Sequence, residues 1–180
     1  DANAIRDIFV RDRDVDLDGI YDEVGFVLTT LVSLPNGGGT GDADSTTPMI
    51  SGNGLYLVYA SRAPNLVVLP PGYTTYLKQQ VYAVDLTVLA VPVTYLISKT
   101  YGGVPVNSNS FLPSISRSGT GIVFSSDAAD IDPFVPDRNH RRDIFLYDWQ
   151  SADNPGMASG ERISLDTALG DPNDDSYAPQ

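Results

Sequence analysis

Pro113-Ser114-Ile115-Ser116 repeats an earlier stretch of this chain, Pro48-Met49-Ile50-Ser51, and Ala178-Pro179-Gln180 begins a third copy. The prolines recur at nearly equal intervals, from position 48 to position 113 and from there to position 179. A spacing that stays constant over this length is typical of a protein assembled from repeated supersecondary units. The repeat therefore governs how the rest of the sequence is interpreted.

Two further markers have the same period. Ser33, Ser98 and Ser164 recur at the same intervals, and each stands equally far before the proline of its unit. An apolar segment that ends in aspartate occurs at residues 7–12, 80–85 and 143–148. Three markers in a constant order indicate that one structural unit recurs along the chain.

Each unit is predicted to hold four short β-strands. In the last complete unit the strands cover residues 113–117, 121–126, 143–148 and 162–165, and in the middle unit the first two cover 49–51 and 55–61. Asn53-Gly54 and Ser118-Gly119 lie between such strands and are typical of hairpin turns, because glycine adopts positive φ without steric cost. The expected fold is all-β, with four antiparallel strands in each repeat, which is the architecture of β-propeller blades.

The last unit resembles a known repeat family. Residues 113–126 read P-S-I-S-x-x-G-x-x-I-V-F-S-S, and D-x-N-x-x-x-D-I-F-L-Y-D and R-I-S-L follow. This pattern resembles the TolB-like propeller repeat of bacterial secreted proteins, and residues 48–99 are similar to it more loosely. The middle unit lacks the D-x-N-x-x-x-D segment, and Asn-Gly or Ser-Gly replaces the family's usual Asp-Gly turn. The resemblance implies binding rather than catalysis, since TolB is a periplasmic partner of other envelope proteins.

The markers divide the chain into about two and a half blades. Residues 1–47 are expected to form a half blade, 48–112 and 113–178 full blades, and 179–180 the start of the next blade. Propellers typically close with about 4–8 blades, and each blade buries its faces only against its neighbours. We therefore expect the end faces to be covered by the remaining blades of the same propeller or by a protein partner, with an oligomer as one form of such a partner.

An acidic insertion distinguishes the first unit. Its markers Asp12 and Ser33 are farther apart in sequence than the corresponding aspartate and serine of either later unit. The insertion reads D-x-D-x-D-G-x-x-D at residues 14–22, and it resembles the nine-residue calcium loop of integrin-type propeller repeats. It is not an EF-hand, because Gly25 stands where that loop has a glutamate.

Alternating aspartates can turn several carboxylates toward one hard cation, and Gly19 permits the bend after the third of them. The expected calcium ligands are Asp14, Asp16, Asp18 and Asp22 through their side chains and Ile20 through its carbonyl. The alternative is a solvated acidic turn. Carboxylates this close together repel one another strongly without a cation, which favours the metal.

Other polar clusters have less specific patterns. Asp137, Asn139 and Asp143 match the polar segment of the TolB-like repeat, and either loop bracing or a second cation site would explain them. Polar residues before the recurring prolines are predicted to cap turns through their side chains, with a second metal site as the alternative. These residues are Asp42, Asp44, Asp171, Asn173, Asp174 and Asp175. The only histidine, His140, lies in a basic cluster at residues 138–142. We expect this cluster to pair with the acidic loop at 127–137, and contact with an acidic partner is the alternative.

Composition excludes several classes of function. The chain has no cysteine, so disulfides and thiolate nucleophiles are excluded. Its net charge of −12 disfavours nucleic-acid binding, and no apolar run is long enough to predict a membrane span. The sequence has no G-x-S-x-G elbow, P-loop or dinucleotide fingerprint, which argues against an enzyme.

The sequence favours a non-catalytic, calcium-stabilised propeller segment that acts as a scaffold or protein-binding module. Two alternatives stay open: an accessory domain of a larger peptidase or polysaccharide-active enzyme, and a glycan-binding propeller. The expected location is extracellular, at the cell surface or periplasmic. The best candidate for a contact surface is the loop at residues 62–79, which includes Tyr73, Tyr76 and Leu77.

Overall fold

A computed structural model describes residues 4–75, 78–135, 137–148, 160–166, 168, 171–172 and 174–179. Within these residues the chain forms ten β-strands and no helix, and all strand pairs are antiparallel. The all-β prediction is therefore confirmed. The described part of the chain has no helix that is long and apolar enough to cross a membrane.

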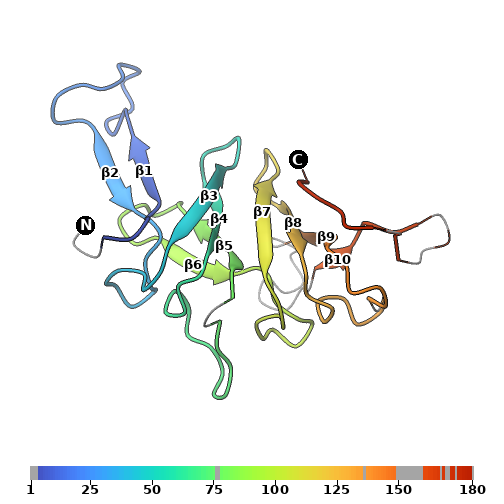
Figure 1. Cartoon of the computed structure of the whole chain (residues 1–180). Coiled ribbons are helices and arrows are strands. Elements are labelled where there is room, and N and C mark those ends of the chain that lie inside the picture. The colour runs from blue at the N-terminus through green and yellow to red at the C-terminus, as the bar shows by residue number, and fades with distance from the viewer. Residues whose placement is uncertain are drawn as a thin grey trace.

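The strands form three sheets that follow one another along the chain (Figure 1). The first sheet pairs β1 (Phe9–Asp12) with β2 (Leu28–Leu31). The second contains β3 (Ser45–Ile50), β4 (Tyr56–Ser61), β5 (Gln80–Asp85) and β6 (Val93–Leu96) in sequential order. The third contains β7 (Ser110–Ile115), β8 (Gly121–Ser126), β9 (Asp143–Asp148) and β10 (Glu161–Arg162), again in sequential order. Four antiparallel strands in each complete unit are thus observed as predicted.

The first strand of each complete unit begins earlier than predicted. β3 starts at Ser45 and β7 at Ser110, although the sequence pattern placed their starts at residues 49 and 113. In both strands the register shifts just before or at the proline, where Thr47 and Leu112 adopt φ of 52° and 46°. A proline cannot donate to a β-ladder and therefore resembles a strand end in a sequence. Here the proline lies within a bulge, and pairing continues on both sides of it.

The hairpin turns form as predicted. Gly54 and Gly119 have φ of 73° and 82°, and their amides donate to the carbonyls of Ser51 and Ser116 at 2.9 and 3.0 Å. The fourth strand of the last unit is shorter than expected, because only Glu161 and Arg162 pair with β9. The predicted strand continued to residue 165, where no ladder is present.

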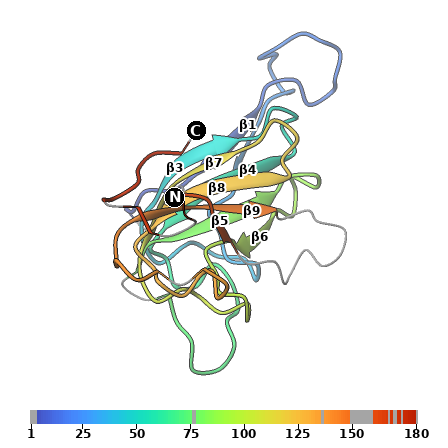
Figure 2. The same cartoon turned by 90° about the vertical axis from the view of Figure 1, so that its right-hand side faces the viewer.

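The middle sheet is buried on both faces. On one face Val58 and Ala83 belong to a cluster that includes Phe124 of the third sheet. On the other face Tyr59 and Tyr82 belong to a cluster that includes Ile8 and Val32 of the first unit. In both views β3 and β7 lie next to each other (Figures 1 and 2). Each sheet therefore buries its apolar surface mainly against its neighbours in the chain.

The serine marker connects strands within each unit. The hydroxyls of Ser33, Ser98 and Ser164 accept hydrogen bonds from the amides of Ile8, Val81 and Ile144, each at 2.9 Å. The same hydroxyls donate to the side chains of Asp7, Gln80 and Asp143 at 2.6–2.7 Å. The segments that follow β2, β6 and β10 are thereby tied to the starts of β1, β5 and β9. These hydrogen bonds explain why the serine recurs.

A second set of hydrogen bonds links each unit to the next. The amides of Ser45, Ser110 and Ser176 donate to the carbonyls of Arg6, Gln79 and Arg142 at 2.8, 2.7 and 2.7 Å. In return, the amides of Arg6, Gln79 and Arg142 donate to side chains at 2.8–3.0 Å. The accepting side chains are those of Asp44, Asn109 and Asp175. The connection between consecutive units is thus made three times with one geometry.

Candidate metal site

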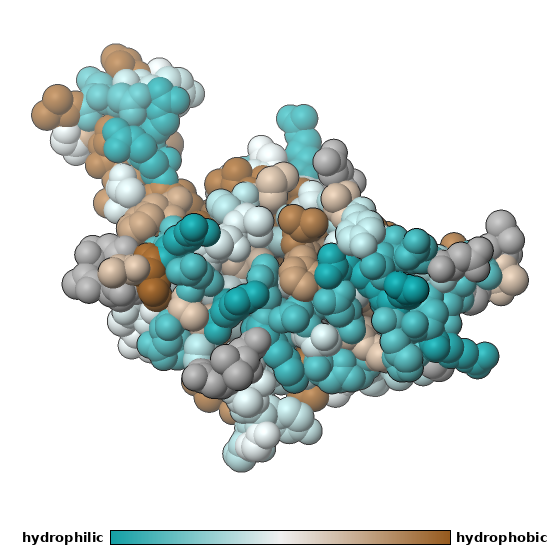
Figure 3. Space-filling model, in the orientation of Figure 1, coloured by the Kyte–Doolittle hydropathy of each residue, from teal (hydrophilic) through white to brown (hydrophobic). Residues whose placement is uncertain are grey.

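The loop between β1 and β2 holds the acidic motif and extends beyond the sheets (Figures 1 and 3). Two backbone hydrogen bonds close its base. The amide of Val15 donates to the carbonyl of Phe26 at 3.1 Å, and the amide of Asp22 donates to the carbonyl of Arg13 at 2.8 Å. Leu17 and Gly19 have φ of 60° and 89°, so the chain bends sharply within the motif. These bends fold alternate aspartates toward one another.

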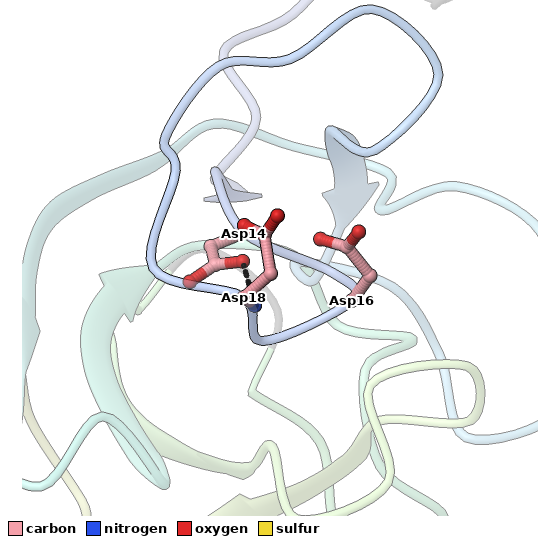
Figure 4. Close-up of side chains that lie close together, drawn as sticks. All are labelled: Asp14, Asp16 and Asp18. Atoms are coloured by element: carbon pink, nitrogen blue, oxygen red, sulfur yellow. Dashed lines mark hydrogen bonds between the residues drawn. The ribbon is translucent and has the colours of Figure 1, made fainter.

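Asp14, Asp16 and Asp18 form a cluster of carboxylates (Figure 4). One oxygen from each lies within 4.8 Å of the others. A hard cation with ligands at about 2.3–2.6 Å can bridge oxygens at this separation. Asp14 is fixed most firmly, because its two oxygens accept from the amides of Asp18 and Gly19, both at 3.1 Å.

Asp22 lies apart from this cluster. Its carboxylate accepts hydrogen bonds from Arg13 Nη2 at 2.6 Å and Nε at 3.0 Å, and from Arg11 at 3.4 Å. The hydrogen bond with Arg13 is the main reason why the pKa of Asp22 is lowered, and burial opposes the shift. Ile20 joins the motif through its amide, which donates to Asp18 at 2.8 Å. The structure thus brings three of the predicted side chains together and pairs the fourth with arginines.

Sequence reasoning overlooked Arg11 and Arg13, although a signal was present. They alternate with Asp12 and Asp14, so both point to the same side of the strand and its extension. The arginine pair neutralises the charge of Asp22, so three of the predicted side chains are left in the carboxylate cluster.

The second acidic group surrounds an arginine of the chain. The buried Arg162 guanidinium contacts Asp143 at 2.9 Å and Asp171 at 2.5 Å, and Asp137 lies 4.0 Å away. Burial opposes the charge, but the hydrogen bonds with Asp143 and Asp171 outweigh it and raise the pKa of Arg162. Asn139 instead donates to the carbonyl of Pro172 at 2.7 Å. Arg162 was assigned only to a strand by sequence, because its partners lie in other segments of the chain.

Three of the predicted capping side chains bond to backbone amides that are distant in sequence. Asp44, Asp171 and Asp175 accept from the amides of Arg6, Arg138 and Arg142, which lie 33 to 38 residues away in sequence. These three side chains bond to backbone amides, as predicted, but the amides belong to distant segments that repeat packing brings to them. Asn173 lies outside the described residues.

Within the basic cluster Arg142 pairs with the acidic loop as predicted, whereas Arg141 pairs with Asp174 outside that loop. Arg142 Nε donates to Asp127 at 2.7 Å, and its guanidinium lies over the rings of Phe111 and Tyr177 at 4.3 and 5.3 Å. His140 is exposed with φ of 53°, and its amide donates to Asp137 at 2.9 Å. In the candidate contact loop Tyr73 and Val68 are exposed, whereas Tyr76 and Leu77 lie outside the described residues.

Fold and site together describe an all-β repeat protein with a carboxylate cluster on a projecting loop. No protein-family model, no curated protein and no solved structure matches this chain.

Proposed function

We propose that this chain is a segment of a β-propeller that acts as a non-catalytic scaffold or protein-binding module. In this proposal β3–β6 and β7–β10 are consecutive blades, and β1–β2 is the outer half of a third. The observation that carries it is the hydrogen-bonded link from Ser45, Ser110 and Ser176 to the preceding unit, which has the same geometry each time. A contact that repeats head to tail generates a ring when its rotation closes.

The innermost strands support the radial arrangement. Thr47, Leu112 and Ala178 each adopt positive φ immediately before a recurring proline. These residues and their prolines line one shared depression of about 460 Å³. Equivalent residues of three successive units thus converge on one place, as expected when the first strands of successive blades surround a common axis.

The biological setting is proposed from the sequence. The TolB-like pattern in residues 113–165 favours an extracellular, cell-surface or periplasmic protein that binds other proteins. The acidic surface of the chain is compatible with that setting.

Calcium is proposed to have a structural role in the first unit. Asp14, Asp16 and Asp18 would hold the ion through side-chain oxygens. The carbonyl of Ile20 and the carboxylate of Asp22 would complete the site only if Asp22 released Arg13. Otherwise water supplies the remaining ligands, since calcium takes about six to eight oxygens.

Electron microscopy of the native protein tests the propeller. Class averages should show a ring in which sheets radiate from a central axis. An open, linear stack of sheets would contradict the proposal. The image separates the two outcomes without any knowledge of the partner.

Calorimetry tests the metal. Calcium should raise the unfolding temperature of the protein, because an ion that binds only the folded state stabilises it by about 2.7 kcal/mol at a hundredfold excess over Kd. Asp18→Ala should remove most of that gain. Asp42→Ala is the matched control, because Asp42 is also an exposed aspartate and lies outside the cluster. An unfolding temperature that neither calcium nor chelator moves would leave residues 14–22 as a solvated acidic turn.

A further inference from the structure

The equivalent strands β1, β5 and β9 have an aromatic residue at the same position of the repeat. These residues are Phe9, Tyr82 and Phe145. In the two complete sheets this residue faces another aromatic directly across the ladder. Tyr82 pairs with Tyr59 and Phe145 with Phe124, with ring centroids 5.7 and 5.9 Å apart and interplanar angles of 24° and 25°. The pair is therefore a repeated feature of the unit.

Phe9 has no such partner in the described part of the chain. β1 pairs only with β2, so its other edge has no neighbouring strand there. Tyr82 and Phe145 are 1% and 2% exposed, whereas Phe9 is 49% exposed. An exposed strand edge beside an exposed aromatic ring is suited to the addition of a strand.

The strands that fill this position elsewhere define the chemistry of the occupant. β4 contains Leu-Val-Tyr-Ala-Ser and β8 contains Ile-Val-Phe-Ser-Ser, so both follow the pattern aliphatic, valine, aromatic, small, serine. Both strands are already paired on both edges, and no third stretch with this pattern occurs in the sequence. A folded second copy of residues 1–180 therefore has no free strand of this kind to offer.

We propose that the open edge of β1 binds an extended polypeptide strand from outside residues 1–180, which places an aromatic side chain opposite Phe9. This inference deepens the proposed function and rests on its repeat-unit part, but not on ring closure or on calcium. The added strand would extend the first sheet to three strands, in the order that β4–β6 and β8–β10 have in the other two sheets. Main-chain hydrogen bonds would supply affinity, and the aromatic pair would fix the register.

A peptide with the sequence of residues 55–63 provides the probe, labelled with a fluorophore and extended by two lysines for solubility. Anisotropy should show saturable binding to the whole chain. Replacing the tyrosine that corresponds to Tyr59 by serine should weaken binding about three- to tenfold, in line with the usual contribution of an aromatic pair. Hydrogen exchange should slow at β1 and stay unchanged at β6 and β10, which are also edge strands.

Phe9→Ser in the protein should weaken binding of the parent peptide by the same factor. Leu28→Ser is the matched control, because Leu28 lies on β2 and is similarly exposed, and it should bind normally. If Phe9→Ser fails to fold, the peptide substitution still tests the pair. The inference would be overturned if both peptides bound equally, if hydrogen exchange slowed at strands other than β1, or if a dimer already occupied β1.

The micrographs separate this inference from ring closure. A ring together with failed peptide binding would refute only the strand addition. Peptide binding without a ring would refute only ring closure.

Discussion

Two arginines of the last unit differ in how deeply their charge is buried. Arg162 is almost fully buried and contacts Asp143 and Asp171, whereas Arg141 is exposed and its pair with Asp174 spans 3.9 Å. Removing one member of a buried ion pair leaves the other charge without compensation, while an exposed pair contributes little. The two arginines therefore have different energetic roles despite lying in similar acidic surroundings.

We expect Arg162→Gln to lower the free energy of unfolding by about 3–5 kcal/mol, because the buried Asp143 carboxylate would lose its charged partner. Arg141→Gln should change it by less than about 1 kcal/mol. Adding Asp143→Asn to Arg162→Gln should recover part of the loss. Urea unfolding of the three variants measures these differences. Equal effects of the two single substitutions would show that the Arg162 cluster does not stabilise the fold.

The carboxylate cluster was predictable from sequence because its members are near neighbours in the chain, so local bends suffice to bring them together. The pairing of Asp22 with Arg13 was harder to foresee, since it depends on how the loop closes. The ion pairs of Arg162 could not be predicted from the sequence. One partner, Asp143, begins β9 and the other, Asp171, follows β10, and only the packing of the third unit brings them together.

At the scale of elements, turn chemistry was predicted best. Glycine in Asn53-Gly54 and Ser118-Gly119 was recognised because positive φ is a local requirement. The predicted starts of β3 and β7 were too late in the chain, because a proline within a bulge resembles a strand end. The two turns also differ in a way that sequence does not reveal. Gly119 approaches Tyr56 of the preceding unit, whereas Gly54 faces open space.

Alanine at these two glycines separates turn strain from contact between units. Both substitutions impose a left-handed conformation on alanine, at a cost of about 1–2 kcal/mol. Gly119→Ala should cost about 1–3 kcal/mol more, because its Cβ would overlap the ring of Tyr56 at Cδ2. Chemical denaturation of both variants supplies the comparison. A Gly54→Ala variant that is equally unstable would mean that Tyr56 yields without cost.

At the scale of the whole molecule, the repeat explains why the middle sheet is the best buried. Val58, Val81 and Ala83 are completely covered by the next unit. Ile144 and Leu146 occupy the positions of Val81 and Ala83 one unit later, but face outward. The period of the sequence predicted this stepwise packing. Ring closure could not be derived from it, because closure depends on a small rotation between units that side-chain patterns do not encode.

The outward face of the last sheet gives the final prediction. Leu146 and Ile163 are 37% and 47% exposed there, beside the half-buried Val123 and Ile144. An apolar face whose equivalent is fully buried in the middle sheet should drive association, despite the repulsion expected from a net charge of −12. We expect residues 1–180 in isolation to show concentration-dependent association in sedimentation velocity at micromolar concentration.

Leu146→Lys together with Ile163→Lys should shift the chain toward the monomer, because two charges would then have to be desolvated on the covered face. Val88→Lys with Val91→Lys is the matched control, since it changes the net charge equally at exposed residues in the turn between β5 and β6. If both double variants weaken association equally, general charge effects rather than the sheet face would be responsible. A compact monomer of the unsubstituted chain at every concentration would show that this face needs no cover. Loss of association in the Leu146 and Ile163 variant alone would place the contact on the face that the next unit of the repeat should occupy.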